Sequence, residues 1–150
     1  MNPTLSGLPA FLSPDGGLRS GLMLAQYTAA ALASDNKVLA HPASADSIPT
    51  SANQEDHVSM GATAARKAAQ ITTHVEQILA IELLCAAQAL EFSRGASLGR
   101  GTAAAAAAVR EVIPPLRDDR VLASDLEAAA ALVRAETLLD AIERAVGSLE

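Results

Sequence analysis

The chain has 150 residues, enough for one domain with its own core. Of these residues 50% are hydrophobic but only 2% are aromatic, so the core must consist of Ala, Leu, Ile and Val, which favours closely packed helices over a sheet sandwich. A formal net charge of -6 with scattered basic residues argues against a nucleic-acid-binding protein, because a phosphate-binding face needs clustered Lys and Arg.

The N-terminal part of the chain predicts an arm followed by a helix. Residues 1–17 contain three prolines and three glycines, which is typical of an irregular segment. From about residue 18 to residue 39, apolar side chains recur at three- and four-residue spacing, which predicts a helix. Pro42 follows and ends this helix.

Residues 44–60 form the most polar stretch and combine amide, carboxylate, imidazole and hydroxyl groups. Pro49 biases the preceding residue away from the helical region, and Ser51 with Gln54 three residues later fits a capping box. We therefore expect a second helix to begin at residues 53–55 and to run to Phe92. The unpaired N–H groups of its first turn favour an anionic group of the protein or of a ligand.

The second predicted helix is too long for a compact globule. Over residues 61–92 it spans roughly 48 Å at about 1.5 Å per residue, whereas a globule of this size has a diameter of about 40 Å. Its apolar band is also too wide for a solvated helix. We infer that other chains, or a further part of the protein, cover it.

The C-terminal part predicts two more helices. Three glycines within residues 93–101 indicate a break, and an Ala-rich helix is expected over residues 102–112, ended by Pro114. Ser124 with Glu127 fits another capping box at the start of an amphipathic helix expected to continue nearly to Glu150. No segment alternates like a strand, so the fold class is all-α. We expect residues 1–92 to form part of a helical bundle that carries the loop 44–60, and residues 93–150 a C-terminal helical region.

The sequence also indicates the cellular location of the protein. It shows neither a signal peptide nor a run apolar and long enough to cross a membrane. Its single cysteine, Cys85, lies in an apolar helical run, where a buried thiol is the simplest interpretation. We therefore expect a soluble, cytoplasmic protein.

Five groups of residues carry a family pattern. They are Asn2-Pro3 with 8–12, residues 20–26, residues 28–32 with Asn36-Lys37 and 40–44, residues 46–51 leading into Asn53-Gln54-Glu55-Asp56-His57-Val58-Ser59-Met60, and residues 82–84 with 87–91. In this pattern the chain resembles the C-terminal half of the aromatic amino acid lyases, and among them the enzymes that act on histidine. The match covers residues 2–92 almost throughout. Beyond about residue 95 it thins to scattered positions such as Arg110, Pro114, Asp119-Arg120 and Asp125.

The resemblance implies a long-helix bundle within a homotetramer and the non-oxidative elimination of ammonia from L-histidine to give trans-urocanate, a step of histidine catabolism. In the family the electrophile is a methylidene-imidazolone (MIO) group cyclised from an Ala-Ser-Gly tripeptide, and a base removes a β-proton. No Ala-Ser-Gly occurs in this sequence. The chain therefore reads as a fragment or as one subunit of a split enzyme, inactive without an MIO-bearing N-terminal half or companion chain.

Glu55 is the candidate catalytic residue. By position alone it is a first-turn glutamate that complements the helix dipole. By resemblance it faces the imidazole of the substrate, at a place where phenylalanine and tyrosine lyases usually have glutamine. A carboxylate accepts an imidazole N–H and favours a charged ring, whereas a phenyl ring offers no such donor. Glutamate here therefore indicates histidine as the substrate.

Gln54 and Met23 are the other candidate substrate-binding residues. Gln54 is either the capping-box glutamine or, by resemblance, a side chain near the substrate and the MIO group. Met23 is by spacing a core residue, since methionine fills irregular apolar gaps. By resemblance it forms a wall of the substrate pocket, and one side chain can serve as both.

Asp56 and His57 are interpreted as hydrogen-bonded residues that hold the loop in shape behind the substrate-binding groups. Together with Glu55 and His41 they raise the question of a metal site. Consecutive helical residues point about 100° apart and cannot all ligate one ion, so we expect no metal. His74, in the middle of the long predicted helix, is expected at the surface or at an interface.

Two alternatives stay open at this stage. One is a non-catalytic helical assembly domain that keeps the lyase scaffold, which the absence of an Ala-Ser-Gly-bearing half upstream of Met1 would favour. The other is a phenylalanine or tyrosine ammonia-lyase or an aminomutase, which Glu55 disfavours. The base is not assigned, because the other candidates of the family lie outside these residues.

Overall fold

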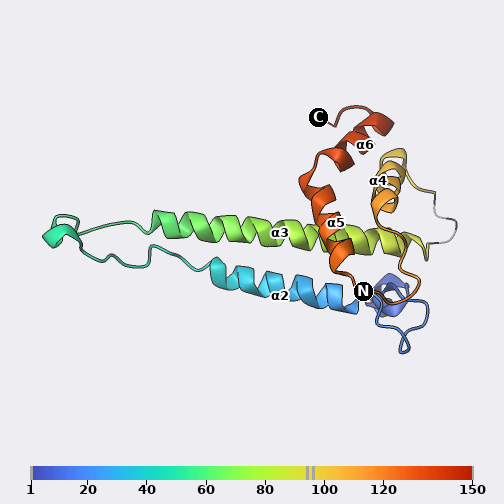
Figure 1. Cartoon of the computed structure of the whole chain (residues 1–150), viewed down its shortest axis with the longest axis horizontal. Coiled ribbons are helices and arrows are strands. Elements are labelled where there is room, and N and C mark those ends of the chain that lie inside the picture. Colours follow the sequence, from blue (N-terminus) through green and yellow to red (C-terminus); the bar gives the residue numbers. More distant parts are fainter. Residues whose placement is uncertain (1, 94, 96, 150) are drawn as a thin grey trace.

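The chain folds into an elongated helical molecule, seen in a computed structural model that describes residues 2–93, 95 and 97–149 (Figure 1). Two antiparallel helices form a hairpin whose connecting loop lies at the narrow end, and three helices gather around the opposite end. These elements are α2 (Met23–Leu39), α3 (Gly61–Leu90), α4 (Arg100–Val112), α5 (Ala123–Arg134) and α6 (Thr137–Val146). The described part of the chain contains no named strand, and the all-α prediction is confirmed.

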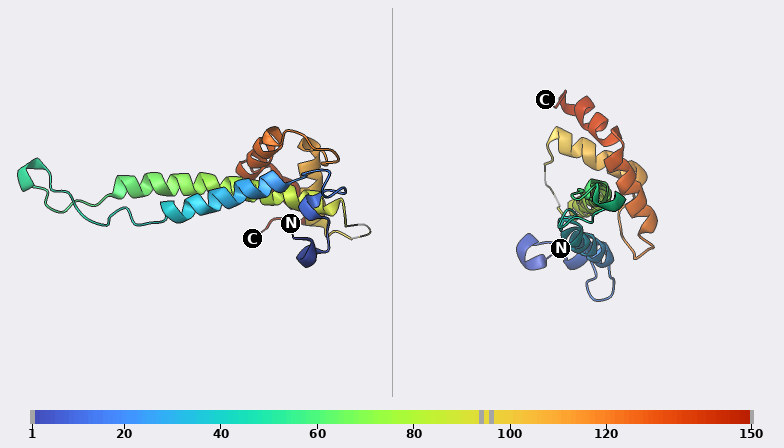
Figure 2. Two further views of the ribbon diagram at one scale, coloured as in Figure 1. Left: turned by 90° about the horizontal axis from the view of Figure 1, so that it is seen from below. Right: turned by 90° about the vertical axis from the view of Figure 1, so that its left-hand side faces the viewer.

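The three C-terminal helices and the N-terminal segment lie on different sides of the hairpin. Viewed along the hairpin, α4 to α6 cover one side and the N-terminal segment lies on the other (Figure 2). α5 packs on α3, while α6 packs on α4. Only the end of the hairpin away from the loop is therefore enclosed.

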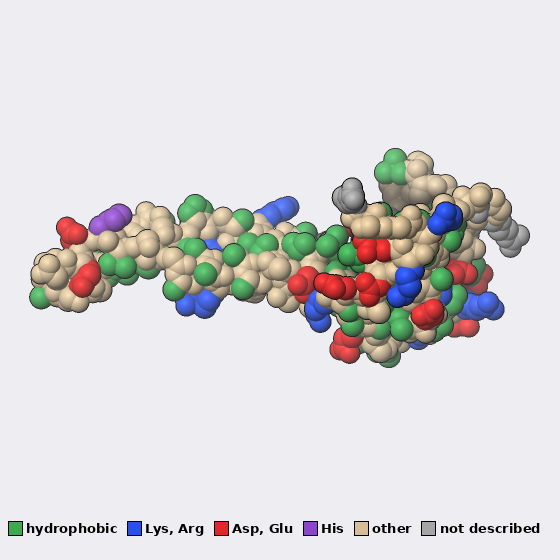
Figure 3. Space-filling view, turned by 90° about the horizontal axis from the view of Figure 1, so that it is seen from above, with side chains coloured by type: hydrophobic (Ala, Val, Ile, Leu, Met, Phe, Trp, Pro, Cys, Tyr) green, Lys and Arg blue, Asp and Glu red, His purple; other side chains and the backbone are tan. Residues whose placement is uncertain are grey.

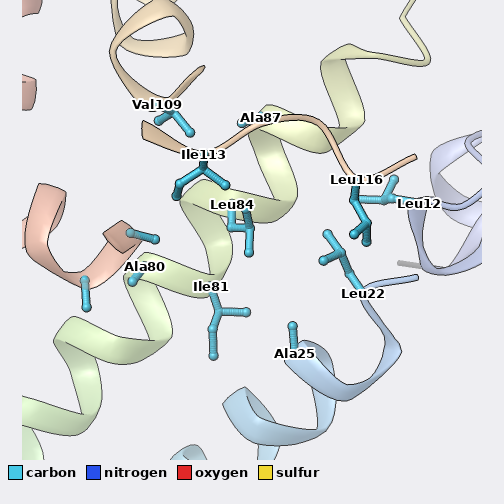
Figure 4. Packing of buried hydrophobic residues seen from close by; sticks show 12 residues of the cluster. Leu12, Leu22, Ala25, Ala80, Ile81, Leu84, Ala87, Val109, Ile113 and Leu116 are labelled. Carbon is cyan, nitrogen blue, oxygen red and sulfur yellow. The ribbon is translucent and has the colours of Figure 1, made fainter. Parts of the chain in front are cut away.

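The core lies where the C-terminal half of α3 meets α5, the start of α2 and the segment after α4. All buried residues of α3 fall between Ala80 and Gln88. Leu12, Leu22 and Leu116 come from three different segments and approach one another in this region (Figure 4). Cys85 packs against the same cluster, and its burial raises the pKa of the thiol. The N-terminal half of α3 extends away from this core, so the loop end has little packing within the chain.

Two polar side chains fasten other segments to α3. The buried amide of Gln88 donates to the carbonyls of Leu12 (3.3 Å) and Leu116 (2.9 Å), and its oxygen accepts the Leu116 N–H (2.9 Å). Arg110 on α4 donates to Glu91 (3.1 Å) and to the carbonyl of Ala87 (2.8 Å). The N-terminal arm and the segment after α4 are thus both tied to the C-terminal end of α3.

The N-terminal part differs from the prediction in two respects. Residues 1–17 are not wholly irregular, because they contain α1 (Pro3–Ser6) and a short 3₁₀ helix, η1 (Ala10–Leu12). The side chain of Asn2 accepts the Thr4 N–H at 3.0 Å and caps α1. The next helix, expected from residue 18, begins at Met23, because the chain first makes a turn at Gly21 with φ of +52°. Its predicted end before Pro42 is confirmed.

The single C-terminal helix expected from Ser124 onward is in fact two helices. Ala135 is extended (φ -84°, ψ 145°) and separates α5 from α6, because α5 packs on α3 and α6 turns away to pack on α4. The Ser124 capping box is not formed, since no side-chain hydrogen bond caps the start of α5. The Ala-rich helix begins two residues earlier than predicted, at Arg100, and ends as predicted at Val112.

The shape leaves much of the surface open to solvent. The accessible area is 9650 Å², whereas a compact monomer of 15.3 kDa exposes about 7100 Å². Hydrophobic side chains lie along the hairpin in the space-filling view (Figure 3). Within the described residues, no helix combines the length and the apolar character that crossing a membrane requires.

Candidate active site

The loop between α2 and α3 carries the residues singled out from the sequence. Gln54, Glu55, Asp56 and His57 are all exposed. Acidic and histidine side chains are visible on the surface near this narrow end of the molecule (Figure 3). The loop extends beyond both helices, so its residues lie far from the core described above (Figure 1).

The loop is held in shape mainly by serines and backbone groups. Ser47 Oγ accepts the Val58 N–H (2.7 Å) and Ser44 Oγ accepts the Met60 N–H (3.0 Å). At the tip, the Thr50 N–H donates to the carbonyl of Glu55 (3.0 Å). These bonds join the segment that leaves α2 to the segment that enters α3. Glu55 therefore lies on a turn that is closed by hydrogen bonds.

The capping box predicted from Ser51 and Gln54 does not form. Residues Ser51–Asn53 make a short 3₁₀ turn, η2, in which Ser51, Ala52 and Asn53 have φ of 51°, 55° and 67°. Positive φ is unfavourable for residues with a Cβ, and such backbone clusters at functional sites. Gln54 donates its own N–H to the carbonyl of Ser51 (3.1 Å). The Gln54 side chain is therefore not needed as a cap here.

The long helix begins at Gly61, not at residues 53–55 as predicted, and it ends at Leu90 instead of Phe92. Glu55 consequently lies outside the first turn of any helix. The explanation of Glu55 as a glutamate that complements a helix dipole is wrong, because the N–H groups of the α3 terminus are six residues away in the chain.

Met23 lies at the other end of the hairpin from Glu55. It is the first residue of α2 and is half-buried, and α2 then runs for 17 residues before the loop starts. At about 1.5 Å per residue the helix alone separates the two residues by roughly 25 Å. A single copy of this chain therefore does not bring Met23 beside the loop residues.

Other residues of interest around Met23 were missed in the sequence. The carboxylate of Asp119 accepts the N–H groups of Ser20 (2.8 Å) and Gly21 (2.9 Å) in the turn before α2. These two hydrogen bonds, followed by the nearby Arg19 charge, lower the pKa of Asp119. A contact across 98 positions leaves no local pattern in the sequence, so this contact was not predicted. The only signal in the sequence is that Asp119 is among the scattered family matches after residue 95.

The loop chemistry is that of hydrogen bonding. An ionised Glu55 accepts hydrogen bonds, the amide of Gln54 both donates and accepts, and His57 adds an imidazole. Asp56 takes part in the loop through its main-chain carbonyl, which accepts from Ser47 Oγ (3.4 Å). In the part of the chain that the structure describes, no three His, Cys, Asp or Glu side chains are grouped as ligands of a metal ion. His74 lies away from the loop, half-buried between α2 and α3, with Nδ1 2.9 Å from Asn36 Oδ1.

Comparison with known proteins identifies the family of this fold and loop. A family model described as aromatic amino acid lyase matches residues 1–111. The chain belongs to the aromatic amino acid lyase family. The resemblance drawn from the sequence is therefore confirmed, and it extends past residue 95, because a histidine ammonia-lyase from Symbiobacterium thermophilum is 64% identical over all 150 residues. The histidine ammonia-lyase from Deinococcus radiodurans is also 64% identical, over 84% of the chain.

Solved structures of family members share the fold. A histidine ammonia-lyase from Trypanosoma cruzi matches with a TM-score of 0.90 and 50% identity over 97% of this chain. A tyrosine aminomutase from Streptomyces globisporus matches with a TM-score of 0.91 and 40% identity over 99% of this chain. The chain spans about 30% of the length of the Symbiobacterium relative and 28% of each of the two solved chains.

Proposed function

We propose that this chain is the C-terminal part of a cytoplasmic histidine ammonia-lyase, which eliminates ammonia from L-histidine to give trans-urocanate. The observation that carries the proposal is the exposed carboxylate of Glu55 on a turn closed by its own hydrogen bonds, in a chain 64% identical to a histidine ammonia-lyase. The similarity of sequence supports the family reaction. The carboxylate supports the choice of histidine within that family.

Glu55 provides an acceptor for an N–H of the substrate imidazole. Its negative charge favours the charged ring, and a charge-assisted hydrogen bond is stronger than a neutral one. Gln54, the neighbour of Glu55, supplies an amide that both donates and accepts near the same ring. Asp56 and His57 are proposed to fix the orientation of these two side chains. Met23 is proposed to form an apolar wall of the pocket.

The MIO group of the family does not fit the residues of this chain. It is formed from Ala-Ser-Gly, and this tripeptide does not occur in the sequence. The electrophile must therefore come from outside these 150 residues. The chain alone is expected to show no turnover, and the assembled enzyme needs an MIO-bearing segment.

The separation of Met23 from Glu55 favours a pocket made by more than one chain. A helix length of roughly 25 Å lies between the two residues, so the Met23 and Glu55 of one copy do not line the same pocket. The proposed homotetramer would supply such a pocket if the Met23 end of one hairpin lay against the loop end of another. The excess exposed area of the molecule and the apolar side chains on the hairpin support such an assembly.

Two other functions have specific observations in their favour. A tyrosine aminomutase shares the fold with a TM-score of 0.91, so the scaffold does not distinguish ammonia release from amino-group migration. A non-catalytic helical assembly domain would also keep this helical scaffold. Glu55 argues against a phenyl substrate, because that ring has neither an N–H nor an O–H to donate to the carboxylate.

The test replaces Glu55 by glutamine in an assembled enzyme. In the Symbiobacterium thermophilum enzyme, the part that matches this chain is replaced by residues 1–150 of this chain. We call the product the grafted enzyme. Glu55→Gln keeps the shape but removes the charge, so kcat/KM for L-histidine should fall about 30- to 1000-fold while the thermal midpoint stays nearly constant.

The matched control is Glu111→Gln, the same change at an exposed glutamate on α4. Its turnover should equal that of the parent within about twofold. Parent-like turnover by the Glu55 variant would remove Glu55 from the active site.

A further inference from the structure

The turn that leads into α2 is held in one conformation by contacts from both sides. Gly21 has φ of +52°, and a Cβ there would lie 2.6 Å from the Phe11 carbonyl oxygen, so only glycine fits. The same carbonyl accepts the Leu22 N–H at 2.9 Å, and the Leu22 side chain is 1% exposed. Contact with the N-terminal arm therefore fixes the inner side of the turn.

On its outer side the turn borders open space. A cavity of about 480 Å³ is lined by Ser20, Gly21 and Leu24 on one side and by Asp119 and the residues after it on the other. The two bonds from the Ser20 and Gly21 N–H groups to Asp119 join residues from the two sides of this lining. On this side the carboxylate is the group that holds the turn.

We propose that Asp119 is a positioning residue for the substrate pocket, because it fixes the turn from which Met23 projects. This inference rests on the proposed function, in which Met23 is a wall of that pocket. Met23 directly follows the turn, and its N–H donates to the Ser20 carbonyl at 3.1 Å. A movement of Ser20 and Gly21 toward the cavity therefore moves the backbone of Met23 and the direction of its side chain.

The segment that carries Asp119 is itself braced. Its neighbour Arg120 donates to Asp125 on α5 (2.9 Å) and to the carbonyls of Pro114 (2.8 Å) and Pro115 (3.2 Å). This network joins the segment to α5 and to the chain that leaves α4. Asp119 is thus presented from a fixed support, as a group that positions another residue must be.

A second link between the same two loops provides a control. Arg19 pairs with Asp118 at 2.7 Å and also donates to the Arg117 carbonyl. The Asp118 side chain is 79% exposed, and its contact is with a side chain rather than with the backbone of the turn. Loss of this ion pair should weaken the link between the loops but leave Ser20 and Gly21 in place.

The experiment compares Asp119→Asn with Asp118→Asn in the grafted enzyme. Asparagine has lost the charge and one of the two acceptor oxygens, so we expect a KM for L-histidine raised about tenfold with kcat changed less than about threefold. Asp118→Asn should keep the parent KM. In the 150-residue chain, amide hydrogen exchange at Ser20 and Gly21 should speed up in the Asp119 variant alone.

A double-mutant cycle separates positioning from general stability. If Asp119 acts through Met23, the effect of Asp119→Asn on KM should disappear in a Met23→Ala background, which should itself have a raised KM. A purely structural Asp119 would lower the thermal midpoint and leave KM unchanged at low temperature. An unchanged KM in Asp119→Asn, or an equal effect in both backgrounds, would overturn the proposal.

Failure of the inference is distinguishable from failure of the proposed function. A raised KM in Met23→Ala with a parent-like KM in Asp119→Asn rejects the positioning role alone. Absence of histidine turnover by the parent grafted enzyme rejects the proposed function. If Asp119→Asn does not fold, Asp119→Glu keeps the charge but displaces the acceptor. The Asp119→Glu variant should then raise KM by less than the rise expected for Asp119→Asn. A parent-like KM in Asp119→Glu counts against the proposal.

Discussion

At the scale of single residues, Gln88 shows how a polar side chain stabilises this core. Its side chain is 2% exposed and serves two carbonyls and one N–H from two segments of chain. Gln88→Met preserves the size but leaves those backbone groups unpaired. We expect the free energy of unfolding to fall by about 2–4 kcal/mol, measured from urea unfolding of the 150-residue chain at fixed concentration.

Gln70→Met on the same helix is the control for this change. Gln70 is exposed, so the free energy of unfolding should change by less than about 0.5 kcal/mol. Equal stability of the two variants would mean that the Gln88 hydrogen bonds contribute nothing in net terms.

The site residues differ in how much of their role is visible in the sequence. Glu55 and its neighbours stand out because they interrupt an apolar chain and carry the family pattern. Gly21 and Asp119 do not stand out, because their importance depends on a backbone turn and a carboxylate that meet only after folding. The substrate roles of Met23, Gln54 and Glu55 stay predictions until the variants described above are measured.

At the scale of elements, the contact between residues 19–21 and residues 117–119 should depend on pH. The Ser20 and Gly21 N–H groups, followed by the Arg19 charge, hold the pKa of Asp119 below its ordinary value. The unfolded chain therefore binds the proton more readily, and the stabilisation is present above the ordinary Asp pKa of about 3.9. It is lost as the pH falls through the lowered pKa of the folded state.

The measurement is a comparison of urea midpoints for the parent chain and Asp119→Asn at several pH values. The parent should be the more stable at about pH 7, and the two midpoints should converge as the pH falls through the lowered pKa of Asp119 in the folded state. If the midpoints of the two proteins differ by the same amount at every pH, the charge of Asp119 is not the cause of the stability difference.

Helix positions were largely predictable, but several helix starts were not. Apolar spacing located the hairpin helices, and the helix propensity of alanine located the Ala-rich helix. The predicted start of α2 was wrong because the chain first makes a turn at Gly21, and the predicted start of α3 was wrong because a closed loop precedes Gly61. The break between α5 and α6 depends on packing against two different helices, which local spacing does not encode. The proposed division of the chain at residues 92 and 93 stays a prediction.

At the scale of the whole molecule, the exposed hairpin predicts self-association. Its surface includes Val38, which is 74% exposed, together with Leu79 and Val75. Burial of such side chains gives roughly 25 cal/mol for each Å² removed from water. We expect sedimentation of the isolated chain to show dimers or larger species. Replacing Val38 and Leu79 by lysine should shift the chain toward monomer, whereas a compact monomer of the parent chain would contradict this expectation.

The central claim is that these residues form the histidine-recognising part of an ammonia-lyase that is completed by other residues. Its most direct test is urocanate formation from L-histidine by the grafted enzyme and by the 150-residue chain, with L-tyrosine and L-phenylalanine as competing substrates. We predict turnover of L-histidine in preference to the other two by the grafted enzyme, and none above the protein-free blank by the chain alone. Urocanate formed by the chain alone, or a folded grafted enzyme that prefers L-tyrosine or leaves L-histidine unchanged, would contradict the account.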